Sequence, residues 1–159
     1  MYRSGHQGAA LVVYAPLGLA LLSLGRPPLA LAGGAVSLAL ASLPDVDQRL
    51  PGVQHRGVTH TVGFALTVGA ALGAVGWLLG AGAGARAEYA AVGFAVGGAA
   101  IVSHLLADAI TPMGITPFWP LSDRHYTAGV CRADNTVANY ALLGLGIAVT
   151  VGVLAVAPR

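Results

Sequence analysis

Long apolar blocks with almost no charge are the feature that most restricts how this chain can fold. Five such blocks cover residues 8–24, 28–43, 61–79, 89–110 and 136–156. Each approaches the ~20 residues that a helix needs to cross about 30 Å of hydrocarbon. The blocks are continuous, rich in Leu, Ala and Gly, and lack the period-two alternation of strands. The sequence therefore predicts an all-α fold, a polytopic transmembrane helical bundle of about five spans.

The composition excludes an ordinary soluble domain. Only 9% of the residues are charged and 56% are hydrophobic, with a mean hydropathy of +0.75, whereas soluble domains carry about 25% charged residues. The basic residues are all arginines and are spread along the chain, so they do not form the clustered basic surface that binds nucleic acid. The single cysteine, Cys131, excludes an internal disulfide. We find no repeat and expect one domain, residues 1–159.

The segment from Met1 to His6 precedes an apolar block, as it would in a signal peptide. That block continues to Leu24 without a clear small-residue cleavage site, and further apolar blocks follow. We therefore expect a multipass protein of the inner or plasma membrane.

Glycines recur at the spacing that lets membrane helices approach closely, as in the pairs Gly69/Gly73 and Gly93/Gly97. A membrane chain rich in Gly and Ala would show the same spacing without any packing role. The spacing alone leaves both interpretations open. Residues 80–86 predict a short turn between the third and fourth spans.

Five spans place the N-terminus, the loop at 44–60 and the loop at 111–135 on one membrane face. That face holds Arg3, Arg49, Arg56, Arg124 and Arg132, and the opposite face holds Arg26, Arg86 and Arg159. Because positively charged residues concentrate on the cytoplasmic side of membrane proteins, we expect the first face to be cytoplasmic.

The histidines and acidic residues gather on that same face, either in its loops or at the ends of spans that reach it. They are His6, His55, His60, His104 and His125, with Asp45, Asp47, Asp108, Asp123 and Asp134. Among the acidic residues only Glu88 falls on the other side. Chance placement would rarely produce this distribution, so we expect a functional cluster.

Two carboxylates stand in the loop after the second span, in the order Pro44-Asp45-Val46-Asp47. This spacing brings two hard oxygen donors close together, as one or two divalent cations require. Solvated loop acids, or acids that cap a helix, would give the same pattern.

Two imidazoles follow, His55 and His60, on either side of a glycine. Imidazole is a ligand for zinc, iron, nickel or copper, and His60 opens the third span. The neighbouring Arg56 is suited to clamp a phosphate or carboxylate of a substrate. The alternative is a pair of interfacial histidines with an arginine anchor.

The pair His104 and Asp108 lies in the fourth span at positions i and i+4, so both side chains share one helix face. Ionisable groups at membrane depth are costly, which points to a function or to a partner. Two alternatives remain open: a His–Asp pair that staples helices together, and a ligand histidine oriented by a second carboxylate.

The remaining polar candidates come from the chain's start and from the last long loop. Pro112 ends the fourth helix, and Trp119 suits a membrane-interface belt or the wall of a site. Residues 122–125, which include Arg124, return polar groups to the same face. His6, just before the first span, is an additional candidate ligand.

Taken together, these motifs resemble the YdjM-like family of inner-membrane proteins, to which metal-dependent hydrolase activity is ascribed largely by inference. The matching residues are His6, Pro44-Asp45-x-Asp47, His55-Arg56-Gly57-x-Thr59-His60, Ser103-His104-x3-Asp108-x2-Thr111-Pro112-x-Gly114, and Pro117-x-Trp119-Pro120-x-Ser122-Asp123-Arg124. They follow one another over most of the chain. The resemblance implies a small multi-span protein with a metal-dependent hydrolase site.

A more distant similarity concerns zinc-dependent phospholipases C and single-strand-specific zinc nucleases, helical enzymes that cleave phosphate esters and also carry a His-x3-Asp pair on a helix. The residues of this chain that follow a similar order are His6, Asp45 or Asp47, His60, His104 and Asp108. This chain lacks the fuller set of histidines and a clear ligand glutamate. The similarity therefore implies one or two metal ions rather than a complete trinuclear site.

We therefore expect an integral membrane metal-dependent hydrolase that acts on a phosphoester or lipid-type substrate at the membrane surface. One or two divalent ions, zinc or else manganese, would be held by His6, Asp45, Asp47, His60, His104 and Asp108. Asp47 or His55 would act as general base, and Arg56 or Arg124 would neutralise an anionic substrate. The expected partners are membrane lipids and a small-molecule or lipid substrate, without nucleic acid.

Two other functions use the same residue types. A transporter for metal ions or protons would need polar groups that continue through the membrane, and the spans at 8–24, 61–79 and 136–156 carry few. A non-enzymatic scaffold would use the His/Asp network, with or without a structural metal, to fix helix packing.

Overall fold

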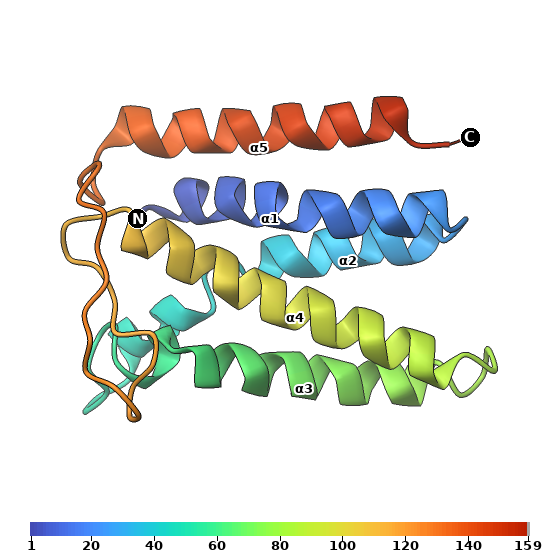
Figure 1. Ribbon diagram of the computed structural model, residues 1–159, viewed down its shortest axis with the longest axis horizontal. Helices are drawn as coiled ribbons and strands as arrows, with labels where there is room; N and C mark the ends of the chain where they lie inside the picture. The colour runs from blue at the N-terminus through green and yellow to red at the C-terminus, as the bar shows by residue number, and fades with distance from the viewer. Residues whose placement is uncertain (159) are drawn as a thin grey trace.

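The computed structural model describes residues 1–158, and in that range it contains five long helices that lie side by side, with no strand (Figure 1). The helices are α1 (Arg3–Ser23), α2 (Pro27–Leu40), α3 (Val62–Leu79), α4 (Arg86–Ala109) and α5 (Thr136–Val156). Two 3-10 helices, η1 (Pro44–Arg49) and η2 (Val58–His60), lie between α2 and α3. Five segments are long and apolar enough to cross a membrane. They are α1, α3, α4, α5 and the segment formed by α2 together with η1. The predicted all-α bundle is confirmed.

Successive long helices run in opposite directions, so the loops divide between two ends (Figure 1). One end, here called the polar end, is formed by the start of α1, the segment 41–61, the end of α4 and the segment 110–135. The opposite end carries the two short turns, at residues 24–26 and 80–85, and the end of α5. This arrangement confirms the predicted sidedness of the loops. Arg159, which the sequence assigns to the opposite end, lies outside the described residues.

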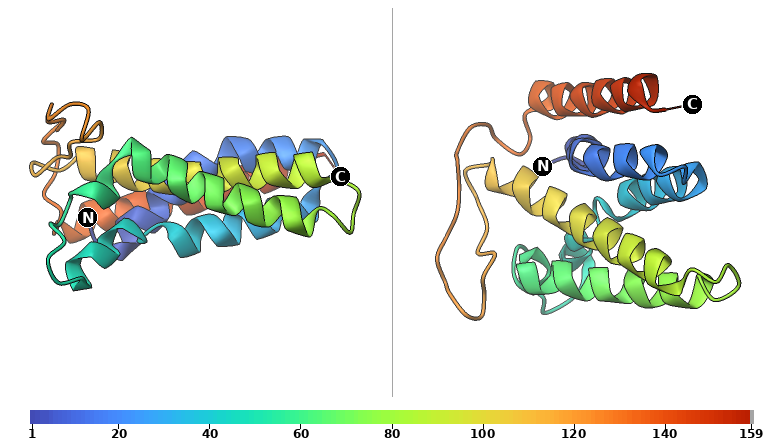
Figure 2. Two further views of the ribbon diagram at one scale, coloured as in Figure 1. Left: turned by 90° about the horizontal axis from the view of Figure 1, so that it is seen from below. Right: turned by 45° about the vertical axis from the view of Figure 1, so that its right-hand side comes forward.

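The helices pack in two close pairs, α3 with α4 and α1 with α5, while α1 and α2 also rest against α4 (Figures 1 and 2). Glycines permit the α3–α4 contact. A Cβ added to Gly93 would overlap the Leu72 carbonyl, and one added to Gly97 would lie 2.9 Å from the Val68 carbonyl oxygen. The small-residue spacing seen in the sequence therefore does mark a helix-packing face.

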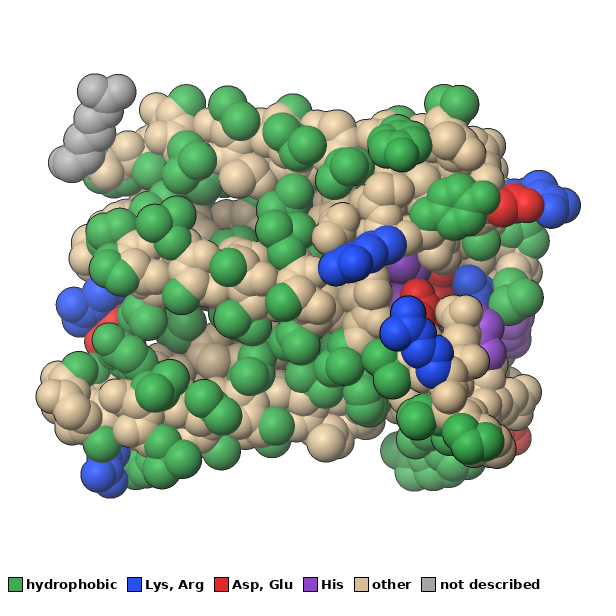
Figure 3. Space-filling model, turned by 180° about the vertical axis from the view of Figure 1, so that it is seen from behind, with side chains coloured by type: hydrophobic (Ala, Val, Ile, Leu, Met, Phe, Trp, Pro, Cys, Tyr) green, Lys and Arg blue, Asp and Glu red, His purple; other side chains and the backbone are tan. Residues whose placement is uncertain are grey.

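Polar side chains buried in the bundle gather near the polar end, while apolar side chains cover much of the helix surfaces (Figure 3). The buried set is His6, Ser37, Asp47, His60, Thr61, Ser103, His104, Asp108, Thr111 and Asn139. Deeper in the bundle, the Tyr14 hydroxyl donates to the Ala30 carbonyl. Within the described residues the buried set does not continue along the helices to the opposite end, as an ion-transport path would require.

Candidate metal centre

Four side chains from three elements converge at the polar end. Asp45 comes from η1, His60 from η2, and His104 and Asp108 from consecutive turns of α4. Each offers one ligand atom, and these atoms all lie within 4.8 Å of one another. The side chains of His60, His104 and Asp108 are almost fully buried, whereas that of Asp45 is 23% exposed. We call this set the four-residue cluster.

Local hydrogen bonds fix the elements that carry these ligands. The Thr61 hydroxyl donates to the Val58 carbonyl and accepts from the Phe64 N–H, so it closes η2 and caps α3 immediately after His60. The Thr111 hydroxyl donates to the Asp108 carbonyl where α4 ends. Threonines at element ends therefore hold two of the ligands in place.

The hydrogen-bond partners decide which nitrogen of each imidazole carries a proton. His104 Nδ1 lies 2.8 Å from the Ala41 carbonyl oxygen, which only accepts, so Nδ1 donates and Nε2 presents a lone pair. The Thr59 hydroxyl donates to Asp47 Oδ2, so Thr59 Oγ1 and Asp47 Oδ2 are both acceptors for His60 Nδ1, at 3.0 and 3.3 Å. When both rings are neutral, the Nε2 atoms of His60 and His104 thus present two lone pairs to each other, 3.1 Å apart.

The spacing of the cluster fits a small divalent cation. His60 Nε2 lies 3.4 Å from Asp108 Oδ2 and 3.7 Å from Asp45 Oδ1, and His104 Nε2 lies 3.5 and 3.7 Å from the same two oxygens. Tetrahedral zinc, with bonds of about 2.0–2.2 Å, separates its ligands by ~3.4 Å. Asp108 Oδ2 is buried and has no hydrogen-bond partner among the described residues. Two lone pairs and two carboxylates that face one another require a positive charge between them, and the cluster can hold a metal ion.

His6 lies beside the cluster. Its ring stacks on that of His104 with centroids 3.8 Å apart, and its Nε2 lies 3.6 Å from Asp45 Oδ2 and 3.7 Å from Asp108 Oδ1. Neither ring nitrogen has a hydrogen-bond partner among the described residues. The oxygen Asp108 Oδ1 already receives Arg56 Nη2 at 2.9 Å and the Met1 amino group at 2.8 Å. These cations favour one ion in the four-residue cluster over a pair of ions bridged by Asp108.

A second group, formed by Asp47, His55 and His60, also has ligand atoms within 4.8 Å of one another. Here both carboxylate oxygens already accept hydrogen bonds. Asp47 Oδ1 is 2.9 Å from His55 Nδ1, and Asp47 Oδ2 accepts from the Arg56 N–H and the Thr59 hydroxyl. The sequence predicts that Asp47 is a metal ligand or base; in the structure Asp47 is buried and contacts the imidazoles of His55 and His60.

The two arginines predicted to meet a substrate lie in different surroundings. The Arg56 side chain is 8% exposed, and its guanidinium donates to Asp108, Thr111 and the Gly114 carbonyl. It is therefore already bound within the protein. Its backbone has a φ of 60°, a conformation that non-glycine residues seldom adopt. Arg124 is exposed, and its guanidinium lies 5.4 Å from the centre of the Tyr126 ring.

The other candidates from the sequence remain outside the cluster. Asp123 and His125 are exposed in the segment 110–135, and Asp134 forms an exposed ion pair with Arg132. The acidic residues and histidines therefore share one end of the bundle, but not all of them belong to one site.

Electrostatics at His60 favour a positive charge in the cluster. Burial opposes protonation of this imidazole, but hydrogen bonding and charge from Asp108 and Asp45 outweigh burial and raise the pKa of His60 above its usual value. A metal ion at Nε2 would take the place of that proton.

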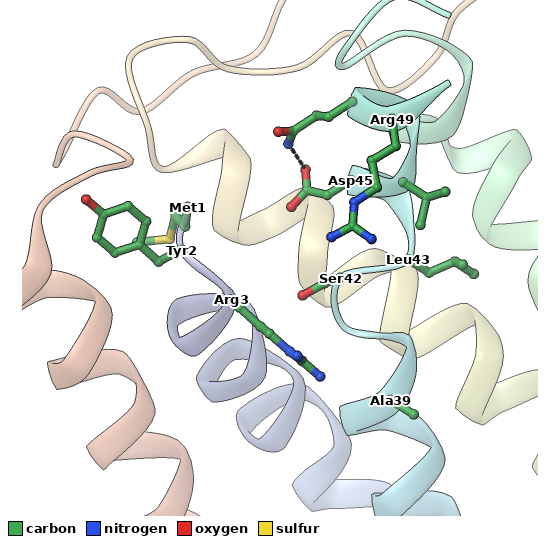
Figure 4. Close-up of a pocket in the computed structure, with 10 residues that line it drawn as sticks. Met1, Tyr2, Arg3, Ala39, Ser42, Leu43, Asp45 and Arg49 are labelled. Atoms are coloured by element: carbon green, nitrogen blue, oxygen red, sulfur yellow. Dashed lines mark hydrogen bonds between the residues drawn. The ribbon is translucent and has the colours of Figure 1, made fainter. Parts of the chain in front are cut away.

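Sequence reasoning missed two arginines that stand next to the cluster. Arg3 and Arg49 line a pocket of about 660 Å³ together with Asp45 (Figure 4). In the sequence, these two arginines counted only towards the orientation in the membrane. The position of Arg49 directly after the Asp-x-Asp loop was the available signal.

One family of known proteins matches this chain over nearly its whole length. Among curated proteins and solved structures, none matches this chain. The family described as YdjM inner membrane protein matches residues 1–158, which include every residue of the four-residue cluster. The chain belongs to the YdjM inner membrane protein family.

Proposed function

We propose that this protein is an integral membrane, metal-dependent hydrolase of phosphoester or lipid-type substrates. The observation that carries this proposal is the four-residue cluster, in which two imidazole nitrogens and two carboxylates have ligand atoms within 4.8 Å of one another. The elements that carry the cluster, η1, η2 and the end of α4, lie at the polar end of the bundle, where a site can meet a substrate at the membrane surface. Within the described residues, five arginines lie at this end and two at the other, which supports a cytoplasmic location.

The four residues of the cluster would hold the metal ion that activates water in this mechanism. A bound divalent ion lowers the pKa of water from ~15.7 towards ~7 and polarises the scissile bond. His60, His104 and Asp108 would hold the ion from buried positions, with Asp45 as the partly exposed ligand on the side of the Arg3–Arg49 pocket.

His55 would be the general base of this mechanism. Its ring centroid lies 5.3 Å from that of His60, its side chain is 35% exposed, and Asp47 accepts from its Nδ1. This hydrogen bond leaves Nε2 of His55 as the nitrogen that would accept a proton during hydrolysis.

The metal content of the purified protein in detergent tests the proposal. We expect about one zinc or manganese ion per chain in the wild type, lost in His104→Ala/Asp108→Ala. The exposed His125→Ala is the matched control and should keep the metal. Asp45→Asn, at a partly exposed position, serves if the double variant does not fold. Absence of bound metal from the wild type, even after zinc and manganese are added back, would refute the proposal.

Four protein ligands also fit a structural metal, because structural zinc sites are closed and catalytic sites keep one position open. X-ray absorption of the zinc protein distinguishes the two by counting ligating waters. Hydrolysis of p-nitrophenyl phosphate and bis-p-nitrophenyl phosphate by the metal-loaded protein, absent from Asp45→Asn, would establish the catalytic role.

A further inference from the structure

A pocket of about 660 Å³ opens beside the four-residue cluster, where α1 begins and α2 ends (Figure 4). Arg3 lies at the start of α1, Ala39 in the last turn of α2, and Asp45 and Arg49 in η1. The pocket therefore lies at the boundary between the apolar bundle and the polar end. Asp45 belongs to both the pocket and the cluster, so a ligand in the pocket reaches the cluster directly.

The two arginines of this pocket are free to bind an anion. Among the described residues, neither Arg3 nor Arg49 forms an ion pair or stacks on an aromatic ring. Figure 4 shows both guanidinium groups directed into the space between α1 and the α2–η1 segment. The space-filling view shows basic side chains on either side of an opening in which acidic and histidine side chains are visible (Figure 3).

Other groups on the pocket wall suit the same ligand. The Ser42 hydroxyl oxygen is buried, lines the pocket and has no hydrogen-bond partner among the described residues. Tyr2, Leu43 and Val46 supply an apolar wall. An unpaired hydroxyl and two unpaired arginines beside an apolar wall match a phosphate group attached to an apolar body.

Two smaller pockets near the cluster lack this combination. They are lined by Arg56 and, in one of them, by His55, but the Arg56 guanidinium is already bound to Asp108, Thr111 and Gly114. Neither contains a residue of the four-residue cluster.

We propose that Arg3 and Arg49 form the substrate's anion-binding site, which holds a phosphate group against Asp45. This inference rests on the proposed function and names the part of the substrate that the protein recognises. The phosphate can belong to a lipid headgroup that enters from the bilayer or to a soluble phosphoester. The arginines predicted from the sequence for this role, Arg56 and Arg124, lie outside the pocket.

Binding of two probes in detergent tests this proposal. Calorimetry measures glycerol 3-phosphate, and native mass spectrometry counts dioleoylphosphatidic acid retained from mixed micelles. We expect Arg3→Gln/Arg49→Gln to weaken binding of the preferred probe at least about tenfold, because charge-assisted hydrogen bonds are lost. Arg132→Gln removes one positive charge from an exposed position at the same end, outside the pocket, and should bind as the wild type does.

Each outcome has a defined meaning. Arginine-dependent binding of the lipid alone identifies the bilayer as the source, binding of glycerol 3-phosphate alone identifies a soluble ester, and binding of both identifies recognition of the phosphate itself. Equal binding by the double variant and the wild type, or no binding by the wild type, overturns the proposal. Metal content is measured in the same samples. Equal or absent binding in samples that keep their metal refutes only the pocket, whereas a wild type without metal refutes the hydrolase.

Discussion

The Nε2 atoms of His60 and His104 face each other across 3.1 Å, although 44 residues separate them in the chain. Their other nitrogens are held by acceptors, Ala41 for His104, and Thr59 with Asp47 for His60. Two lone pairs at this distance repel unless a cation or a shared proton lies between them. This relationship is the reason that the cluster could hold a metal ion.

Asp47 should control metal affinity without contacting the metal. Asp47→Asn removes the charge that orients His60 and His55, so we expect zinc affinity to fall about 10- to 100-fold, the usual effect of losing such a supporting carboxylate. A competition titration with a chelating dye measures this change. Asp134→Asn, an exposed carboxylate at the same end, is the control. Wild-type affinity in Asp47→Asn would contradict the positioning role.

Arg56 should stabilise the metal-free protein more than the metal-bound one. Its side chain is 8% exposed, and it pairs with Asp108, which is 1% exposed. Arg56→Ala leaves a buried carboxylate with fewer cationic partners, which costs on the order of 3 kcal/mol. Thermal unfolding in detergent should show a lower Tm, and saturating zinc should narrow the difference from the wild type because the ion also neutralises Asp108. An equal Tm deficit with and without zinc would argue against this coupling.

Metal affinity should fall as the pH is lowered. The pKa of His60 is raised above 6.5 in the metal-free protein, so its protonated form is favoured below that raised value and competes with the metal. Above the raised pKa the imidazole is neutral and affinity should level off. Below it we expect about a tenfold loss per pH unit, because one proton is displaced. Calorimetry in two buffers of different ionisation enthalpy should detect that proton, and a pH-independent affinity would contradict the prediction.

Replacing a glycine of α4 by alanine should destabilise the protein at Gly93, which contacts α3, but not at Gly98. Gly93→Ala places a methyl group against the Leu72 carbonyl and should destabilise the protein by about 1–3 kcal/mol. Gly98 has no neighbouring atom within 4 Å of an added Cβ, so Gly98→Ala should be neutral or stabilising by up to about 1 kcal/mol. The unfolding midpoints of the two variants are measured in detergent. Similar midpoints would contradict the close contact between Gly93 and Leu72.

The sequence by itself determined the helices, their number and their sidedness. Apolar blocks of membrane length can satisfy their backbone groups only as helices, and alternating spans fix which loops share an end. The i and i+4 spacing of His104 and Asp108 likewise placed both side chains on one face of α4. These conclusions depend on local geometry, so residue order was enough.

Only the tertiary structure decided which of the predicted site residues lie in contact. Asp45 and Asp47 stand two residues apart on a 3-10 helix, so they point in different directions, and the packing of η1 determines that Asp45 faces His60 Nε2 while Asp47 faces His60 Nδ1. In the same way, Arg56 folds inward onto Asp108, and Arg3 and Arg49 are left beside the pocket. The sequence could place charged residues on one membrane face, but the contacts between loops at that face set the direction of each side chain.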